Sequence, residues 1–242
     1  MRFSPTSHPR LCFAAAAIVV AASAFAADEF DMYVADIAIL QAKAVRTELK
    51  ITDTIRAAMN KHAAWLDKQG ADIDRLVRGG TITVAEGNRR TKIHLATLKS
   101  KVLRELSGAQ VKRLREITLQ RDGLVPLMDQ RVSDKIGMTA AQLTKIREAY
   151  VANDNKAKQI QKAAFSPIFE KYGNMKPKSE SEKKRIEELA NKELGVEKKR
   201  IQPQLEKLGK EFEALVAETL TKGQKDAFNK LKGTPFKPKE EG

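Results

Sequence analysis

The sequence predicts an all-α fold of elongated antiparallel helical hairpins, in which one helical unit occurs twice. Three observations support this prediction. Apolar residues recur at spacings of three and four, which is the period of an amphipathic helix. A short helix-start phrase occurs four times, and parts of the first half match parts of the second half in apolar pattern. Aromatic residues make up only 5% of the chain and charged residues 31%, which is typical of long helices with solvated outer faces.

The N-terminal segment, residues 1–26, has the three regions of a secretory signal peptide. Arg2 and Arg10 precede an apolar run, and small residues follow it up to Ala26, after which we expect cleavage. A retained anchor is the alternative, because the run is marginal for spanning a bilayer. Cys12, the only cysteine, would leave with the signal. We therefore expect a periplasmic or secreted protein without thiols and without a transmembrane segment after cleavage.

Four helix starts are marked by a Ser or Thr that follows an apolar residue. The hydroxyl of such a residue accepts a hydrogen bond from a free amide at the helix start. In the last three copies, a Gln at the third helical position completes a capping box by bonding back to the cap. The first copy has Ile55 in that place. The expected structural caps are Thr52, Ser107, Gln110, Thr139, Gln142, Thr221 and Gln224.

These phrases divide the chain into two expected helical units, 27–122 and 123–236. A shift of 87 positions lays residues 45–52 over 132–139, and a shift of 114 lays 102–117 over 216–231. Each unit is expected to hold a short helix, a capped long helix, a returning helix and a short capped closing helix. Residues 237–242 are expected to be a disordered tail, and the chain from Gly233 onward is expected to be extended and poorly ordered.

Glycine and proline mark the interruptions of the two helix pairs. Residues 79–83 are expected to connect the first pair and residues 173–179 the second pair. Pro167 and Pro203 fall inside helical patterns. Each proline predicts either a kink in one helix or the end of one helix and the start of another.

Few residues in the chain offer catalytic chemistry. His62 and His94 have no second histidine or carboxylate at metal-ligand spacing, and no phosphate-binding loop or nucleophile elbow is present. We therefore expect no catalytic residue, no cofactor and no metal site, and a protein that is not an enzyme. His62 is expected to be partly buried and hydrogen-bonded, and Trp65 to lie in the core or at a seam between helices.

Charge gives the strongest hint of function. Lys and Arg number 45 against 31 Asp and Glu, a net charge of +14, and the excess is concentrated between residues 88 and 122. This pattern predicts a basic surface beside an apolar stripe, suited to flexible chains that are partly acidic and partly apolar. A merely solvated face is the alternative. The absence of aromatic residues among these bases disfavours nucleic acid. The candidate client-binding residues are Arg89, Arg90, Lys92, Lys99, Lys101, Arg104, Lys112, Arg113 and Arg115.

The helix-start phrases resemble the motif of the Spy/CpxP family of periplasmic LTxxQ proteins, and the chain is similar to its large, internally duplicated members. The phrases that carry the resemblance are 45–52, 106–110 continuing into 113–120, 136–142, 220–224 and 233–236. The resemblance implies a chaperone that works without ATP, or an envelope-stress protein, built as a cradle of bent helices that is often a homodimer. Some relatives bind zinc, which the two mature histidines fit poorly.

The resemblance and the charge together give the expected function and its alternatives. We expect a chaperone-like protein of the holdase type, which binds unfolded or partly folded proteins on a basic and apolar helical surface. A structural or regulatory module that docks to an envelope protein is the alternative, and a metal-responsive protein is a third hypothesis. Duplication within one chain could replace the homodimer of the family.

Overall fold

The computed structural model describes residues 27–238, and within this range the chain is helical and contains no strand, as expected. The predicted signal peptide lies outside the described residues. The elements in order are α1 (Glu29–Val34), η1 (Ile37–Gln41), α2 (Lys43–Glu48), α3 (Asp53–Arg78), α4 (Val84–Arg104), α5 (Gly108–Asp122), η2 (Val125–Met128), α6 (Gln130–Lys135), α7 (Ala140–Gly173), α8 (Glu180–Thr219) and α9 (Lys222–Lys232). None of these helices has both the length and the hydropathy needed to cross a bilayer.

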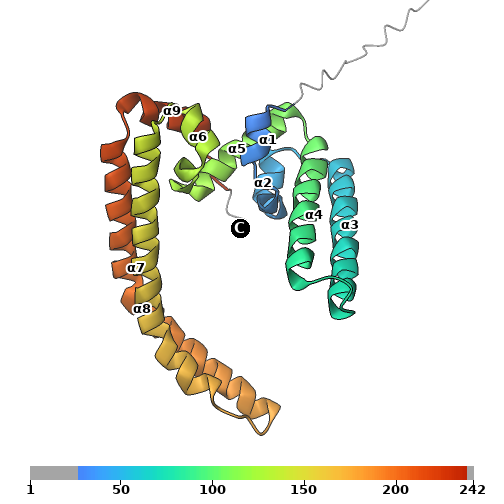
Figure 1. The fold of residues 1–242 in the computed structure, drawn as a ribbon, viewed down its shortest axis with the longest axis vertical. Helices are drawn as coiled ribbons and strands as arrows, with labels where there is room; N and C mark the ends of the chain where they lie inside the picture. Colours follow the sequence, from blue (N-terminus) through green and yellow to red (C-terminus); the bar gives the residue numbers. More distant parts are fainter. Residues whose placement is uncertain (1–26, 239–242) are drawn as a thin grey trace, which may run out of the picture.

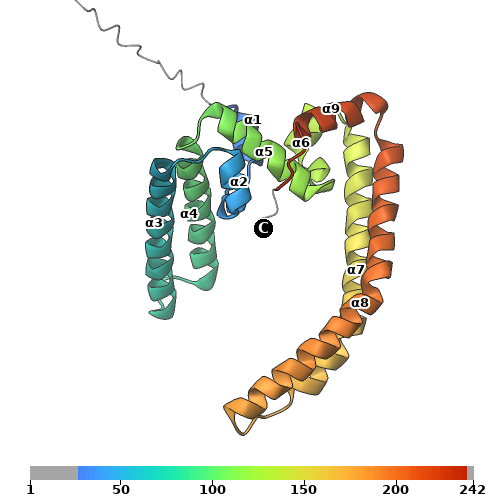
Figure 2. The same cartoon turned by 180° about the vertical axis from the view of Figure 1, so that it is seen from behind.

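Two helical arms extend from a platform of shorter helices (Figure 1). We call α3 with α4 the first arm, α7 with α8 the second arm, and the remaining helices and 3-10 turns the platform. Both arms run in the same direction away from the platform, and the longer second arm bends toward the side of the first (Figures 1 and 2). The two helices of each arm pack against each other along their length.

The structure places a hydroxyl cap at each of the four marked helix starts. Thr52 accepts a hydrogen bond from the amide of Ile55 at 3.2 Å. Ser107, Thr139 and Thr221 each form a complete capping box with the Gln at the third helical position. Sequence reasoning missed the caps formed by Asp28, Asp36, Thr83, Asp129 and Ser179, which do not belong to the repeated phrase. A signal was present at Thr83 and Ser179, because Glu86 and Glu182 follow them at the capping-box spacing.

The order of helices in the two halves follows the shifts seen in the sequence. Helices α2 and α6 cover residues 43–48 and 130–135, and the long helices α3 and α7 begin at 53 and 140. Helices α5 and α9 begin at 108 and 222. The matching starts lie 87 and 114 positions apart, as the shifts require. That the halves arose by duplication stays a prediction.

Two apolar clusters form the core, and each is built mainly from one half. Leu119 of the first half belongs to the second cluster, and Phe236 of the second half packs on the first cluster. Related positions are buried in both clusters, because the same helix faces turn inward. The related buried pairs are Val45 with Val132, Leu49 with Ile136, Val102 with Val216, Leu106 with Leu220, and Leu114 with Phe228. The platform therefore holds most of the buried apolar residues, and the outer parts of the arms hold few.

Both prolines lie inside helices that continue through them. Pro167 is within α7 and Pro203 within α8. Proline removes one backbone hydrogen bond and crowds the preceding turn, which bends a helix rather than ending it when packing holds both sides. Figure 1 shows the second arm bent part of the way along its length. The kink is thus the correct alternative of the two that the sequence left open.

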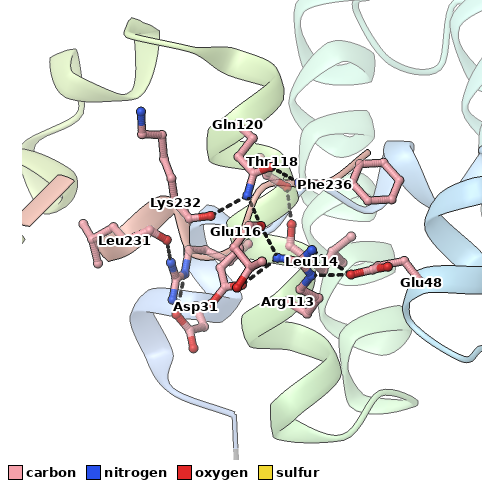
Figure 3. Close-up of polar contacts among 12 residues, drawn as sticks. Asp31, Glu48, Arg113, Leu114, Glu116, Thr118, Gln120, Leu231, Lys232 and Phe236 are labelled. Atoms are coloured by element: carbon pink, nitrogen blue, oxygen red, sulfur yellow. Dashed lines mark hydrogen bonds and ion pairs between the residues drawn. The ribbon is translucent and has the colours of Figure 1, made fainter. Parts of the chain in front are cut away.

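The segment after α9 is packed, which corrects the expectation of poor order from Gly233 onward. Gly233, with φ 64, ends α9 and turns the chain back onto α5. The carbonyl oxygen of Thr234 accepts from Arg113 at 2.7 Å and from Gln120 at 2.9 Å (Figure 3). The amide of Phe236 donates to Gln120 at 2.7 Å, and its ring packs on the first apolar cluster. Of the predicted tail 237–242, residues 239–242 lie outside the described range.

Candidate functional site

The candidate client-binding residues are divided between two helices and do not share one face. Arg89, Arg90, Lys92, Lys99, Lys101 and Arg104 lie on α4, and Lys112, Arg113 and Arg115 lie on α5. Successive residues of an α-helix are turned by about 100°. Lys92 and Lys101, nine positions apart, therefore project from opposite sides of α4. The basic residues expected to form a surface beside an apolar stripe are therefore spread around the helix.

Two of these bases share one carboxylate. Glu86 accepts from Arg89 at 2.7 and 2.9 Å and from Arg90 at 2.7 Å. The hydrogen bonds from Arg89 and then from Arg90 lower the pKa of Glu86 to about 2. Part of the positive charge at the outer end of the first arm is therefore neutralised within α4 itself.

The seam between α3 and α4 holds the aromatic and histidine residues. Trp65 packs edge-on against His94 with ring centroids 5.5 Å apart, and the ammonium of Lys101 lies 4.0 Å from the Trp65 ring centroid. His62 Nε2 lies 2.8 Å from Glu105 Oε1. Both expectations are confirmed, because Trp65 lies at a helix seam and His62 is half-buried and hydrogen-bonded.

Arg115 belongs to the interior of the platform, so its assignment to a client-binding surface is wrong. Its side chain is buried, with the residue 4% exposed. It donates to Asp31 at 2.8 Å and to the carbonyl oxygen of Leu231. This guanidinium joins α1, α5 and α9, and its charge is used inside the molecule.

Arg113 is likewise held by internal partners. It donates to Glu48 at 2.8 Å and to Glu116 at 3.0 Å, in addition to Thr234 (Figure 3). Burial tends to lower its pKa, and the hydrogen bonds to Glu116 and Glu48 more than offset that effect, so the pKa is raised. We therefore assign Arg113 to the joint between α2, α5 and the C-terminal segment, and not to a free surface.

Three candidate bases remain exposed without a carboxylate partner among the described residues: Lys92, Arg104 and Lys112. Lys92 and Arg104 lie on α4 of the first arm, where large apolar side chains are also exposed, and Lys112 lies on α5 of the platform. Val84 is 65% exposed, and Ile93 and Leu95 are each 49% exposed. Apolar side chains and positive charge without a carboxylate partner are thus both exposed along α4, with Val84 and Leu95 on about one side and Ile93 on the opposite side.

The structure contains a groove that the sequence did not indicate. Helix α2 and the 3-10 turn η1 form one side of it, and the first arm forms the other. The groove has a volume of about 820 Å³. Its walls are mainly apolar and include Ile37, Leu40, Met59, Leu98 and Val102. These residues come from segments up to 65 positions apart, so no local pattern in the sequence marks them as neighbours. The groove is larger than the hollow of about 650 Å³ beside Gly233.

Two half-buried cations border this groove and bind backbone carbonyl oxygens. The ammonium of Lys99 donates to the carbonyl oxygen of Tyr33 at 2.5 Å, and burial lowers its pKa. The guanidinium of Arg46, which sequence reasoning missed, donates to the carbonyl oxygens of Leu40, at 2.9 Å, and of Gln41. Both cations complete the C-terminal ends of short helical turns, where carbonyl groups lack helical partners.

Neither a metal-binding cluster nor a similar known protein gives further information on the site. Within residues 27–238, no group of three or more His, Cys, Asp or Glu side chains is placed to hold a metal ion. Comparison of the chain with models of protein families, with curated proteins and with solved structures found no match.

Proposed function

We propose that the protein is a non-enzymatic periplasmic chaperone of the holdase type, which shields unfolded or partly folded proteins on the first arm. One observation carries the proposal: α4 exposes Val84 and Leu95 on about the same side, and Lys92, three positions before Leu95, has no carboxylate partner among the described residues. Exposed large apolar side chains that are rimmed by charge are typical of surfaces that bind other chains.

Both arms pair some of their bases with nearby acids, as Arg75 pairs with Asp72 in the first arm and Arg200 with Glu197 in the second, each at 2.7 Å. Lys92 and Arg104 of the first arm have no such pair among the described residues. We assign the proposed surface to the first arm because the excess of bases between residues 88 and 122 begins on α4. Unpaired charge attracts acidic segments from a distance, and apolar contact then holds them.

The expected binding is weak and fast. Charge steering raises association rates more than it tightens complexes. Burial of apolar area contributes about 25 cal/mol per Å², which for a few side chains gives only moderate affinity. Such binding suits a protein that delays aggregation and releases its client without a nucleotide.

A light-scattering assay with insulin, whose chains aggregate after reduction, tests the proposal. The protein at a severalfold molar excess should suppress scattering at low salt, and less at about 0.15 M salt, where charges are screened beyond about 8 Å. Absence of suppression at both salt concentrations would overturn the proposal.

A pair of double variants tests the assignment to the first arm. Lys92→Glu with Arg104→Glu should reduce the suppression severalfold at low salt. Lys145→Glu with Lys199→Glu makes the same change of charge at exposed positions of the second arm and should leave the suppression unchanged. If both double variants reduced the suppression of insulin aggregation equally, the net charge of the protein, and not the first arm, would account for the suppression.

The alternative is a structural or regulatory module with one envelope partner. The apolar side chains exposed on α4 favour it as well, because an exposed apolar patch can also mark the docking face for a single partner. A single stoichiometric partner in a pull-down, together with no protection of insulin, would support this alternative over the holdase.

A further inference from the structure

We propose that the groove between η1 and the first arm binds a long-chain carboxylate, with the chain along Leu40, Met59, Leu98 and Val102 and the carboxylate at Lys99 and Arg46. The binding of such an amphiphile goes beyond the holdase function and does not depend on it. The groove, its apolar walls and its two cations each contribute to the inference.

The size and lining of the groove fit one apolar chain. A volume of about 820 Å³ lies within the roughly 300–1,000 Å³ usual for small-molecule sites. Leu40 and Val102 form part of the fully buried floor, and Met59 and Leu98 are half-buried beside them. An apolar chain placed there would cover surface that the fold leaves in contact with water, which is the main source of affinity for such ligands.

The cations at the groove retain unused hydrogen-bond donors. An ammonium has three N–H donors and a guanidinium has five. Lys99 uses one donor on Tyr33, and Arg46 uses Nη1 on the carbonyl oxygens of Leu40 and Gln41. Asp36 attracts Lys99 electrostatically, but no hydrogen bond or ion pair joins the two, and Arg46 binds only neutral carbonyl groups. Both half-buried cations have therefore lost hydration without gaining a bonded anion. An anion at this place would restore that balance through charge-assisted hydrogen bonds.

The other charged groups of the groove are already paired. Asp36, the acid in the groove wall, accepts from Arg121 at 2.7 Å and from the amide of Ala38 at 2.9 Å. Arg56 lies 2.9 Å from Asp53. The charge that remains for a ligand is therefore positive, and it comes from Lys99 and Arg46.

The residues that line the groove favour a hydrocarbon chain over a peptide as the ligand. Every residue of a bound peptide has an amide and a carbonyl group, and each of these needs a hydrogen-bond partner when it leaves water. Apart from its charged residues, the groove offers only Gln41 and Asn60 as polar side chains. A chain with a single polar end satisfies the groove better, because all its hydrogen bonds are made at one point.

Calorimetric titration of the whole protein with dodecanoate, below its micellar concentration, tests the proposal. We expect one molecule bound per chain. Lys99→Gln should weaken binding about tenfold, because a charge-assisted hydrogen bond is lost. Lys92→Gln is the matched control, since Lys92 lies seven positions earlier on about the same side of α4 and is exposed outside the groove, and it should not change the affinity.

A second variant and a second ligand keep the test independent of the structural role of Lys99. Ala63→Trp adds bulk at the exposed mouth of the groove, so the variant should keep the melting temperature of the parent and lose dodecanoate binding. Dodecanol should bind more weakly than dodecanoate and equally well to the parent and to Lys99→Gln.

The proposal would be overturned if dodecanoate did not bind to the parent protein, or if dodecanol bound to the parent as tightly as dodecanoate. It would also be overturned if a folded Ala63→Trp variant bound dodecanoate unchanged, or if an apolar peptide displaced dodecanoate at a concentration below that of the dodecanoate. A zwitterionic lysophospholipid with the same chain should bind less tightly than dodecanoate, and tighter binding would likewise contradict the assignment of the cations to a carboxylate.

Discussion

The two halves of the molecule build the same turn before their long helices with different residues. Lys50 and Gly137 both precede the cap by two positions, with φ values of 52 and 72. The hydrogen bonds agree as well, since Ile51 donates to the carbonyl of Arg46 and Met138 to that of Ser133, both at 2.9 Å. The comparison shows that the hydrogen-bond pattern defines the turn, while the residue type sets its energetic cost.

The joints between platform and arm differ more than the turns do. In the second half, Gln142 and Gln224 hydrogen-bond to each other at 3.0 Å, and Gln224 also donates to the carbonyl of Gly137 at 2.7 Å. In the first half, Ile55 stands where Gln142 would be and packs on the apolar cluster. Gln110 donates to Leu49 and Arg113 to Glu48, both at 2.8 Å, but these hydrogen bonds join α5 to the end of α2 and do not involve α3. The second arm is thus fixed by a polar joint and the first arm by a mainly apolar one.

The largest expected effect concerns a residue that only the first half provides. Arg115→Met should destabilise the protein by about 3–5 kcal/mol, because it leaves the buried carboxylate of Asp31 without its partner. The related position in α9 is the exposed Asn229, where Asn229→Met should change stability by no more than about 0.5 kcal/mol. Denaturant unfolding measures both, and equal effects would refute the central role of the Arg115 pair.

The polar joint is the next test. Gln142→Ile makes the second half like the first and should cost about 1–3 kcal/mol, because its partners at Thr139, Thr219 and Gln224 lose hydrogen bonds. Gln159→Ile, at an exposed position of the same helix, is the control and should stay within about 0.5 kcal/mol of the parent. Similar losses for both variants would mean that helix propensity, and not the joint, explains the change.

The glycines that end α5 and α9 give a third comparison. Gly123 and Gly233 have φ values of 62 and 64, so replacement of either by Ala is strained, by about 1 kcal/mol. A Cβ at Gly233 would also lie 2.3 Å from the Glu116 carboxylate and displace it from Arg113, whereas nothing lies within 4 Å of one at Gly123. We expect Gly233→Ala to lower the melting temperature more than Gly123→Ala does.

The turn before the long helices offers a stabilising test. Lys50→Gly should raise the free energy of unfolding by up to about 1 kcal/mol, because glycine adopts positive φ without strain. Gly137→Lys should lower it by a similar amount. Chemical denaturation of both variants checks the prediction, and a loss of stability in Lys50→Gly would contradict it.

The smallest expected effect is the pH dependence of the two arms. The pKa of Glu86 is lowered to about 2 from 4.5, first by its hydrogen bond to Arg89, and that of Glu193 is lowered first by its hydrogen bond to Lys171. A carboxyl group whose pKa is lower in the folded than in the unfolded protein stabilises the fold at pH values above its unfolded pKa. This stabilisation is lost as the pH falls toward its folded pKa. The melting temperature should therefore decline slightly between pH 4.5 and 2, and less in Glu86→Gln. If the melting temperature of Glu86→Gln declined with pH as steeply as that of the parent, Glu86 would not be a source of the pH dependence.

Many features of the fold could be predicted because they depend on neighbours in sequence. The caps at Ser107, Thr139 and Thr221 and their Gln partners lie within three residues of each other, so the pattern alone indicates the helix start. The candidate site was predicted less well. Lys92 and Arg104 are exposed as expected, but Arg115 is buried and paired with Asp31. The local sequence around Arg115 does not indicate this pairing, because Asp31 lies far away along the chain.

The sequence by itself determined where most helices begin, that the chain is all-α and that its two halves follow one order, since these properties follow from contacts within a few residues. Only the tertiary structure decided which bases stay free, that residues 233–236 pack on α5, and that a groove lies beside η1. The physical reason is the length of chain between the partners: Arg115 meets Asp31 across 84 positions and Phe236 meets Gln120 across 116, and no local periodicity encodes such pairings.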